Sequence, residues 1–200
     1  MADFTQSQVT LISHQALTHP GSIVGSAQSV ASYISAVVSI WHANVETVAN
    51  AEGVRYKIQG SPMSSGNEDW TDLFEWITGT TSAETETLTA TEPQAETDLA
   101  VAATANFEVG DVVYVQDTGT LADSEWGEVE EVVSNVSVNL LDGLANAKDS
   151  SDVLWDQAER IAVEINCAGL SRIRVVVVHR AATGSDVHCR VETLFATDLE

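Results

Sequence analysis

Positive charge is the scarcest feature of this sequence. Eight basic residues stand against 30 acidic ones in a chain of 200 residues, which gives a formal net charge of −22. A chain this acidic is repelled by nucleic-acid phosphates and by anionic membrane surfaces. We therefore expect neither nucleic acid nor membranes among its partners. The charge favours solubility and suits a salty medium, where ions screen the self-repulsion.

Long apolar runs are also missing. No stretch approaches the ~18 apolar residues that a membrane-spanning helix requires. The N-terminus has no basic segment ahead of an apolar one, so we expect no secretory signal peptide. Hydrophobic residues still make up 44% of the chain, which is enough for a packed core.

Cysteine is nearly absent, with only Cys167 and Cys189. The sequence contains no CxxC pattern, so neither a zinc ribbon nor a redox motif is supported. Both cysteines fall on apolar-facing positions of expected strands, which favours two buried free thiols. A bridge between neighbouring strands is the alternative that spacing leaves open.

Catalytic and metal-binding signatures are missing as well. The sequence has no G-x-S-x-G, HExxH, P-loop or GxGxxG motif. Its five histidines form no metal-spaced pair, and Asp111, Asp117 and Asp123 lack the glycine and glutamate pattern of an EF-hand. We predict no catalytic residue, no cofactor and no metal site, and a protein that is not an enzyme.

What the sequence does have is a series of short β-forming segments. Residues 54–59 alternate between apolar and polar, and the valine-rich run at 173–179 suits a central strand. Similar runs occur at 30–41, 70–77, 161–167 and 187–192, whereas 153–160 indicates one short helical turn. The pattern predicts an all-β fold, an antiparallel β-sandwich.

A second unit is predicted at residues 91–156. Short strands at 107–115, 126–133 and 136–141, the last two joined by a two-residue turn, are typical of a small SH3-like β-barrel. The segment contains 15 of the 30 acidic residues and one basic residue, Lys148. We expect an acidic barrel that is inserted into the sandwich.

The remaining residues divide between the sandwich and the N-terminus. Residues 29–90 and 157–200 are expected to form the sandwich together, and two sequential β domains are the alternative. Residues 1–28 are small and polar and show no sustained period of 2 or 3.6. They are predicted to form an extended N-terminal arm, or a disordered tail in the free molecule.

About half of the chain resembles a known family. Segments 54–78, 107–132, 136–144 and 171–192 resemble a β-sandwich structural protein of tailed-bacteriophage particles. The resemblance implies an accessory virion component, assembled in the host cytoplasm, such as a head decoration (cement) protein or a neck, tail or baseplate piece. It also implies the major capsid protein or other virion proteins as partners, a homo-oligomer such as a trimer, and an arm that grips the capsid.

Scarce positive charge and strand position identify candidate contact residues. We expect capsid or subunit contacts from Arg55, Tyr56, Lys57, Arg172, Arg174 and Arg190. Trp41, Trp70 and Trp76 lie among apolar neighbours and are expected in the core, whereas Trp126 and Trp155 flank polar stretches and are expected to be exposed aromatic contacts.

Two functions follow from these expectations. The first is a capsid decoration protein that binds the outside of the head shell and stabilises it. The alternative is a tail, neck or fibre module that binds carbohydrate or a host surface through exposed aromatic side chains.

Overall fold

The computed structural model describes residues 6–46, 52–66, 69–180 and 186–196, and the part of residues 1–28 that precedes residue 6 lies outside them. Strands dominate the described residues, and the only helical element there is a single 3-10 turn, η1 (Leu121–Asp123), so no helix in them is long enough to cross a membrane. The all-β prediction is confirmed. The strands are β1 (Gln6–Thr18), β2 (Gly21–Val24), β3 (Gln28–Ser29), β4 (Ser35–Asn44), β5 (Val54–Ser61), β6 (Thr71–Ile77), β7 (Thr85–Thr87), β8 (Asp98–Ala100), β9 (Val112–Gln116), β10 (Glu125–Val133), β11 (Ser137–Leu140), β12 (Val153–Trp155), β13 (Ala158–Asn166), β14 (Arg172–His179) and β15 (Asp186–Ala196).

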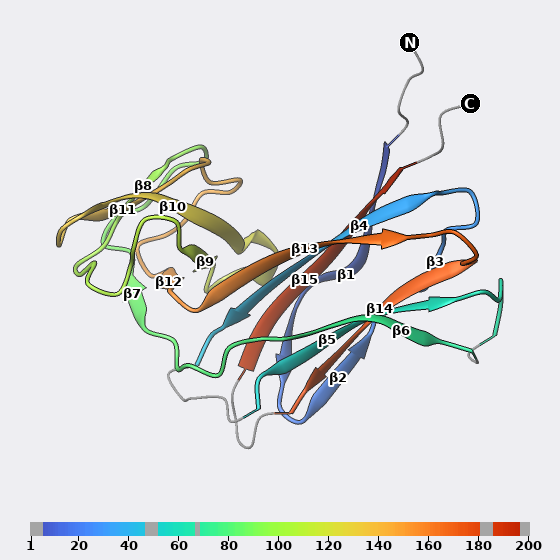
Figure 1. The fold of residues 1–200 in the computed structure, drawn as a ribbon. Coiled ribbons are helices and arrows are strands. Elements are labelled where there is room, and N and C mark those ends of the chain that lie inside the picture. The colour runs from blue at the N-terminus through green and yellow to red at the C-terminus, as the bar shows by residue number, and fades with distance from the viewer. Residues whose placement is uncertain (1–5, 47–51, 67–68, 181–185, 197–200) are drawn as a thin grey trace, which may run out of the picture.

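Two antiparallel sheets form a β-sandwich (Figure 1). Sheet A has the order β1-β15-β4-β13, and sheet B has the order β2-β14-β5-β6, with β3 also paired to β14. Alternate residues of each strand point inward, so Ile40 of sheet A and Val177 of sheet B are fully buried in one core. The intervening side chains point to the outer face of each sheet.

A six-stranded sheet between β6 and β13 forms the barrel. Its order is β7-β12-β9-β10-β11-β8, and the two end strands approach each other at the Leu88–Val101 bridge, where Thr89 N donates to Ala100 O at 2.9 Å. Its core is separate from that of the sandwich and includes Leu99 and Leu154. The unit begins at β7, upstream of the expected boundary at residue 91, because β7 pairs with β12.

The chain enters and leaves the barrel through a narrow neck. Glu84 N donates to an Asp156 carboxylate oxygen at 2.8 Å, and Asp156 N donates to Glu84 O at 3.3 Å. The helical turn expected at 153–160 is absent, because these residues form β12 and the start of β13. Leu154, for example, pairs with Val115 on β9 and with Glu86 on β7.

The expected N-terminal arm is corrected by the structure. Residues 6–18 are strand β1, which pairs with β15 at the edge of sheet A, and residues 21–24 are β2, which pairs with β14 in sheet B. Leu11, Ile12 and Leu17 are buried in the sandwich core. Two register shifts interrupt β1 between Thr10 and Gln15, and these bulges remove the period of 2 that would have revealed a strand.

Both cysteines are buried free thiols, as the sequence favours. Cys167 follows β13 and Cys189 lies within β15.

Candidate functional site

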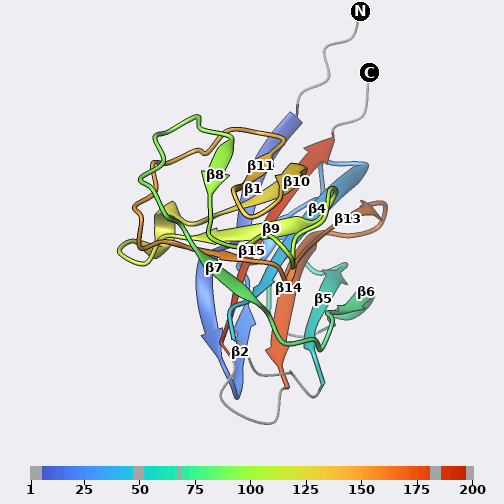
Figure 2. The ribbon, with the colours of Figure 1, turned by 90° about the vertical axis from the view of Figure 1, so that its left-hand side faces the viewer.

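The barrel is fixed to the outer face of sheet A by a buried junction. Tyr114 on β9 is fully buried, and its hydroxyl lies 2.9 Å from Nε2 of His14 and 2.5 Å from Nδ1 of His188. Trp126 on β10 donates its indole N–H to the carbonyl of His42 at 3.0 Å. Figure 2, seen from the barrel side, shows the barrel strands in front of sheet A.

Burial keeps the histidines of this junction neutral. It lowers the pKa of His14 to about 4, with the charges of His188 and Arg190 adding to the effect, and it also lowers the pKa of His188 to about 4. A hydroxyl has one proton to donate. One histidine therefore accepts the Tyr114 proton, and the other donates its own N–H to the Tyr114 oxygen.

A groove of about 220 Å³ opens beside the junction, between β10 and sheet A. Trp41 and Arg160 line it from the sandwich, and Trp126 with the loop at residues 140–143 lines it from the barrel. Trp41 lies in mid-sheet, directly paired with Arg190 on β15 and with Arg160 on β13. The Arg160 guanidinium carbon lies 4.2 Å from the Trp41 ring centroid.

Two further recesses share lining residues with this groove, and both reach Trp41. One, of about 210 Å³, lies toward Ala145 and Arg190, and the other, of about 260 Å³, lies toward Glu192. Arg190 donates to the Glu192 carboxylate beside it. Trp41 therefore lines all three hollows.

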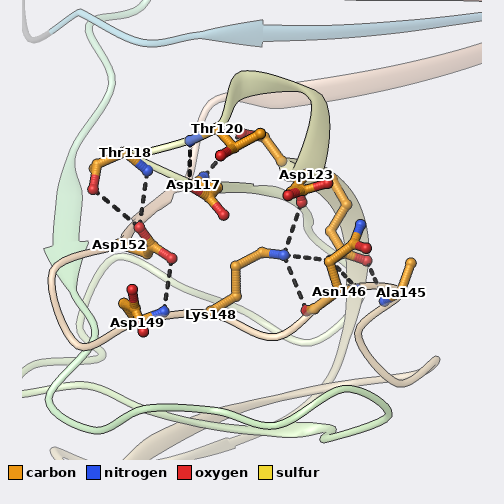
Figure 3. Close-up of polar contacts among 11 residues, drawn as sticks. Asp117, Thr118, Thr120, Asp123, Ala145, Asn146, Lys148, Asp149 and Asp152 are labelled. Carbon is orange, nitrogen blue, oxygen red and sulfur yellow. Dashed lines mark hydrogen bonds and ion pairs between the residues drawn. The ribbon is translucent and has the colours of Figure 1, made fainter.

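A buried lysine holds the barrel wall of the groove in place (Figure 3). Lys148 is only 1% exposed, and its ammonium donates to Glu125 Oε1 at 2.7 Å, Asp123 O at 2.8 Å and Asn146 O at 3.1 Å. Glu125 in turn accepts the N–H of Ala145 at 2.7 Å. This network ties the loop that follows β11 to the start of β10.

The aspartates around Lys148 are engaged by the backbone. Asp117 accepts from the N–H groups of Gly119 and Thr120, and Asp152 accepts from those of Thr118 and Asp149 (Figure 3). These carboxylates stabilise turns. Across the described residues, no three His, Cys, Asp or Glu side chains are grouped as a metal site would require.

Three charged groups at the groove have no charged or hydrogen-bonding partner among the described residues. They are Arg160, whose guanidinium stacks on Trp41, and the exposed carboxylates of Glu128 and Asp142 on the barrel wall. The groove therefore presents a donor, two acceptors and two indoles, which come from β4, β10, β13 and the loop that follows β11.

Four of the predicted contact residues share the outer face of sheet B. Arg55 and Lys57 on β5 form ion pairs with Glu75 at 3.6 Å and 3.5 Å, and Lys57 also reaches Asp72 at 2.5 Å. On β14, Arg172 donates to Met63 O at 2.7 Å, and the Arg174 guanidinium lies 4.1 Å from the Trp70 ring centroid.

Tyr56 and Arg190 lie elsewhere. Tyr56 is fully buried, with its hydroxyl 2.9 Å from His42 Nδ1, so it is not a surface contact. It points inward because it alternates with Arg55 and Lys57 along β5. Arg190 belongs to sheet A, where it borders the groove.

The expected roles of the tryptophans are largely reversed. Trp126 and Trp155 are half-buried in the junction, where the Trp155 indole donates to the Gln116 side chain at 2.8 Å. Of these two, Trp126 lines the groove and Trp155 does not. Trp41 and Trp70 lie on outer faces of the sheets under arginines, whereas Trp76 packs on Tyr56. Ile40 and His42 on β4 are buried, so the alternation of the strand turns Trp41, which lies between them, to the outer face.

Comparisons with known proteins give weak likenesses. No family model matches the chain, and no curated protein matches it. Among solved structures it is similar to the SPBc2 prophage-derived protein YomS, with a TM-score of 0.35 and 9% identity over 98% of this chain and 97% of that one. It is also similar to a structure of infectious bursal disease virus, Gx strain, with a TM-score of 0.27 and 12% identity over all of this chain and 42% of that one.

A VP2 subviral particle of infectious bursal disease virus is similar at a TM-score of 0.25 and 10% identity, over all of this chain and 43% of that one. The chain thus spans less than half the length of the viral chains. At these TM-scores the likeness carries no argument about function, which therefore rests on the chain's own residues.

Proposed function

We propose that this chain is a structural virion protein that binds the outside of a head shell through sheet B and stabilises it without catalysing a reaction. The observation that carries the proposal is a segregation of charge. Four of the seven basic residues outside the barrel, on β5 and β14, lie on the outer face of sheet B. The acidic barrel is attached to sheet A on the other side (Figure 1). The resemblance of four segments to tailed-phage structural proteins supports the same reading.

The outer face of sheet B has the composition of a protein-binding surface. Exposed apolar side chains, among them Val24 at 60% and Ile77 at 46% exposure, lie among Arg55, Lys57 and Arg174. Arginine is enriched at protein interfaces, and the buried centre of an interface is more apolar than the surface around it. The ion pairs with Asp72 and Glu75 are solvent-exposed and weak, so an acidic partner surface can replace them at little cost.

The barrel has the opposite character. Its only basic side chain, Lys148, is buried, so the charged groups on its described surface are carboxylates. Attached through sheet B, the protein would hold this acidic lobe away from the shell, where like charges on neighbouring lobes repel one another. Stabilisation would come from mass action, because the protein binds the assembled shell and not the separated subunits.

The test is co-sedimentation of the purified protein with bare heads of the phage that encodes it. We expect Val24→Asp and Ile77→Asp to lose retention, because each places a charge in the apolar part of the docking face. Val37→Asp is the matched control, since Val37 is an exposed valine of sheet A, and it should be retained like the wild type.

Two results would count against the proposal. Failure of the wild-type protein to bind heads would remove the decoration function, and full retention of both sheet B variants would remove the proposed face. Deletion of residues 1–28 is not a clean test, because it takes out strands of both sheets.

A further inference from the structure

We propose that the groove between β10 and sheet A binds a neutral saccharide. This inference goes beyond the decoration function and does not rest on it. It starts from the two indoles of Trp41 and Trp126, whose ring centroids lie 6.1 Å apart with the rings tilted by 42°. One indole comes from the sandwich and the other from the barrel, and both line the groove.

The indoles supply the apolar part of the site. Leu140 and Val112 add to the apolar lining of the groove. Ligand sites are mostly apolar and aromatic, with a few placed polar groups that fix orientation. The C–H-rich side of a sugar ring fits such a surface, because it is apolar while the ring edge carries hydroxyls.

The polar groups select a ligand that both donates and accepts hydrogen bonds. Arg160 can only donate, and the ionised carboxylates of Glu128 and Asp142 can only accept. A sugar hydroxyl does both, so it satisfies groups of either kind. An anionic polymer would be repelled by Glu128, Asp142 and the acidic barrel. A cationic ligand would be repelled by the guanidinium of Arg160.

The walls of the groove are already held in place. The Trp126 indole is bonded to His42 O, Arg160 is stacked on Trp41, and Glu125 is held by Lys148. A site that needs little ordering loses less affinity on binding. The groove is smaller than the roughly 300 Å³ of a small drug pocket, so it suits a short stretch of a saccharide chain that continues into the recesses beside Trp41.

The experiment is a titration of the 200-residue chain with cellohexaose, chitohexaose and maltohexaose, in which binding is followed by changes in the NMR shifts of backbone amides. We expect at least one of these neutral sugars to shift signals of β4, β10 and β13. Arg160→Ala and Asp142→Asn should each weaken that binding by about tenfold. Both residues are exposed, so these variants keep the fold, and Trp41→Ala should abolish binding.

Trp70→Ala is the matched control. Trp70 carries the same kind of arginine stack, with Arg174 at 4.1 Å, but on sheet B and away from the groove, so the variant should bind like the wild type. The proposal is overturned if none of the three sugars shifts these signals, if Trp70→Ala weakens binding as much as Arg160→Ala, or if polygalacturonate binds more tightly than the neutral sugars.

Discussion

Acidification should loosen the junction between the barrel and sheet A. His14 and His188 both contact the Tyr114 hydroxyl, and burial lowers the pKa of each from 6.5 to about 4. In the unfolded chain these histidines take up protons below pH 6.5, whereas in the folded protein they do so only near pH 4. The stability that the two neutral histidines contribute is therefore fully present above pH 6.5 and is lost as the pH falls toward 4.

The size of the effect follows from the two pKa values. Lowering the pH from 7 to 5 should decrease the free energy of unfolding by about 2 kcal/mol for each histidine. Solvent reaches the half-buried His14, so we expect about 3 kcal/mol for the pair. The charges that act on them oppose each other, because Arg190 disfavours protonation of His14 and Asp186 favours protonation of His188.

The assay is urea unfolding at pH 7 and pH 5 at constant ionic strength, followed by tryptophan fluorescence. Trp126 is a suitable probe because its ring lies 4.9 Å from that of His14. Carboxylates also titrate in this range, so the histidine effect is the difference between the wild type and the His14→Gln, His188→Gln double variant. His19→Gln is the control. An equal loss of stability in the wild type and the double variant would refute the reasoning.

Other predictions concern the barrel, the thiols and the first strand. Lys148→Met should lower the unfolding free energy by about 3 kcal/mol, because it leaves Glu125 without its cation, and an unchanged urea midpoint would contradict this. Burial raises the pKa of Cys189 to about 12 and also raises that of Cys167, so neither thiol should react with Ellman's reagent at pH 8 until the protein is denatured; prompt reaction would show that they are accessible. Deleting residues 1–18 should expose the edge of β15 and the core beneath it, giving an aggregated or unfolded chain by circular dichroism, and a folded monomer would be the contrary result.

The sequence was most informative where a strand alternates regularly. The alternation of β5 placed Arg55 and Lys57 outward, and the outward positions of β14 added Arg172 and Arg174, so four cations on one face were predictable. Tyr56 was wrong as a contact residue for the same reason, since the pattern itself turns it inward. Strand β1 escaped prediction because its bulges disrupt the alternation, and because its partner β15 lies at the other end of the chain.

The groove was out of reach of the sequence. Trp41, Trp126 and Arg160 come from three separate strands. Trp126 lines the same groove as the other two because the barrel is fixed to sheet A. Which sheet receives β15, and hence Arg190, depends on the pairing of β15 with β4. Such non-local pairing leaves no mark in local composition.

The neck between Glu84 and Asp156 makes the barrel a module that can be exchanged. No barrel residue belongs to the core of the sandwich, and the two ends of the insertion are already hydrogen-bonded to each other. A short loop across those ends would cost little chain entropy. A replacement domain joined at Glu84 and Asp156 would therefore leave the core of the sandwich intact, provided that it covers the part of sheet A that the junction around Tyr114 buries.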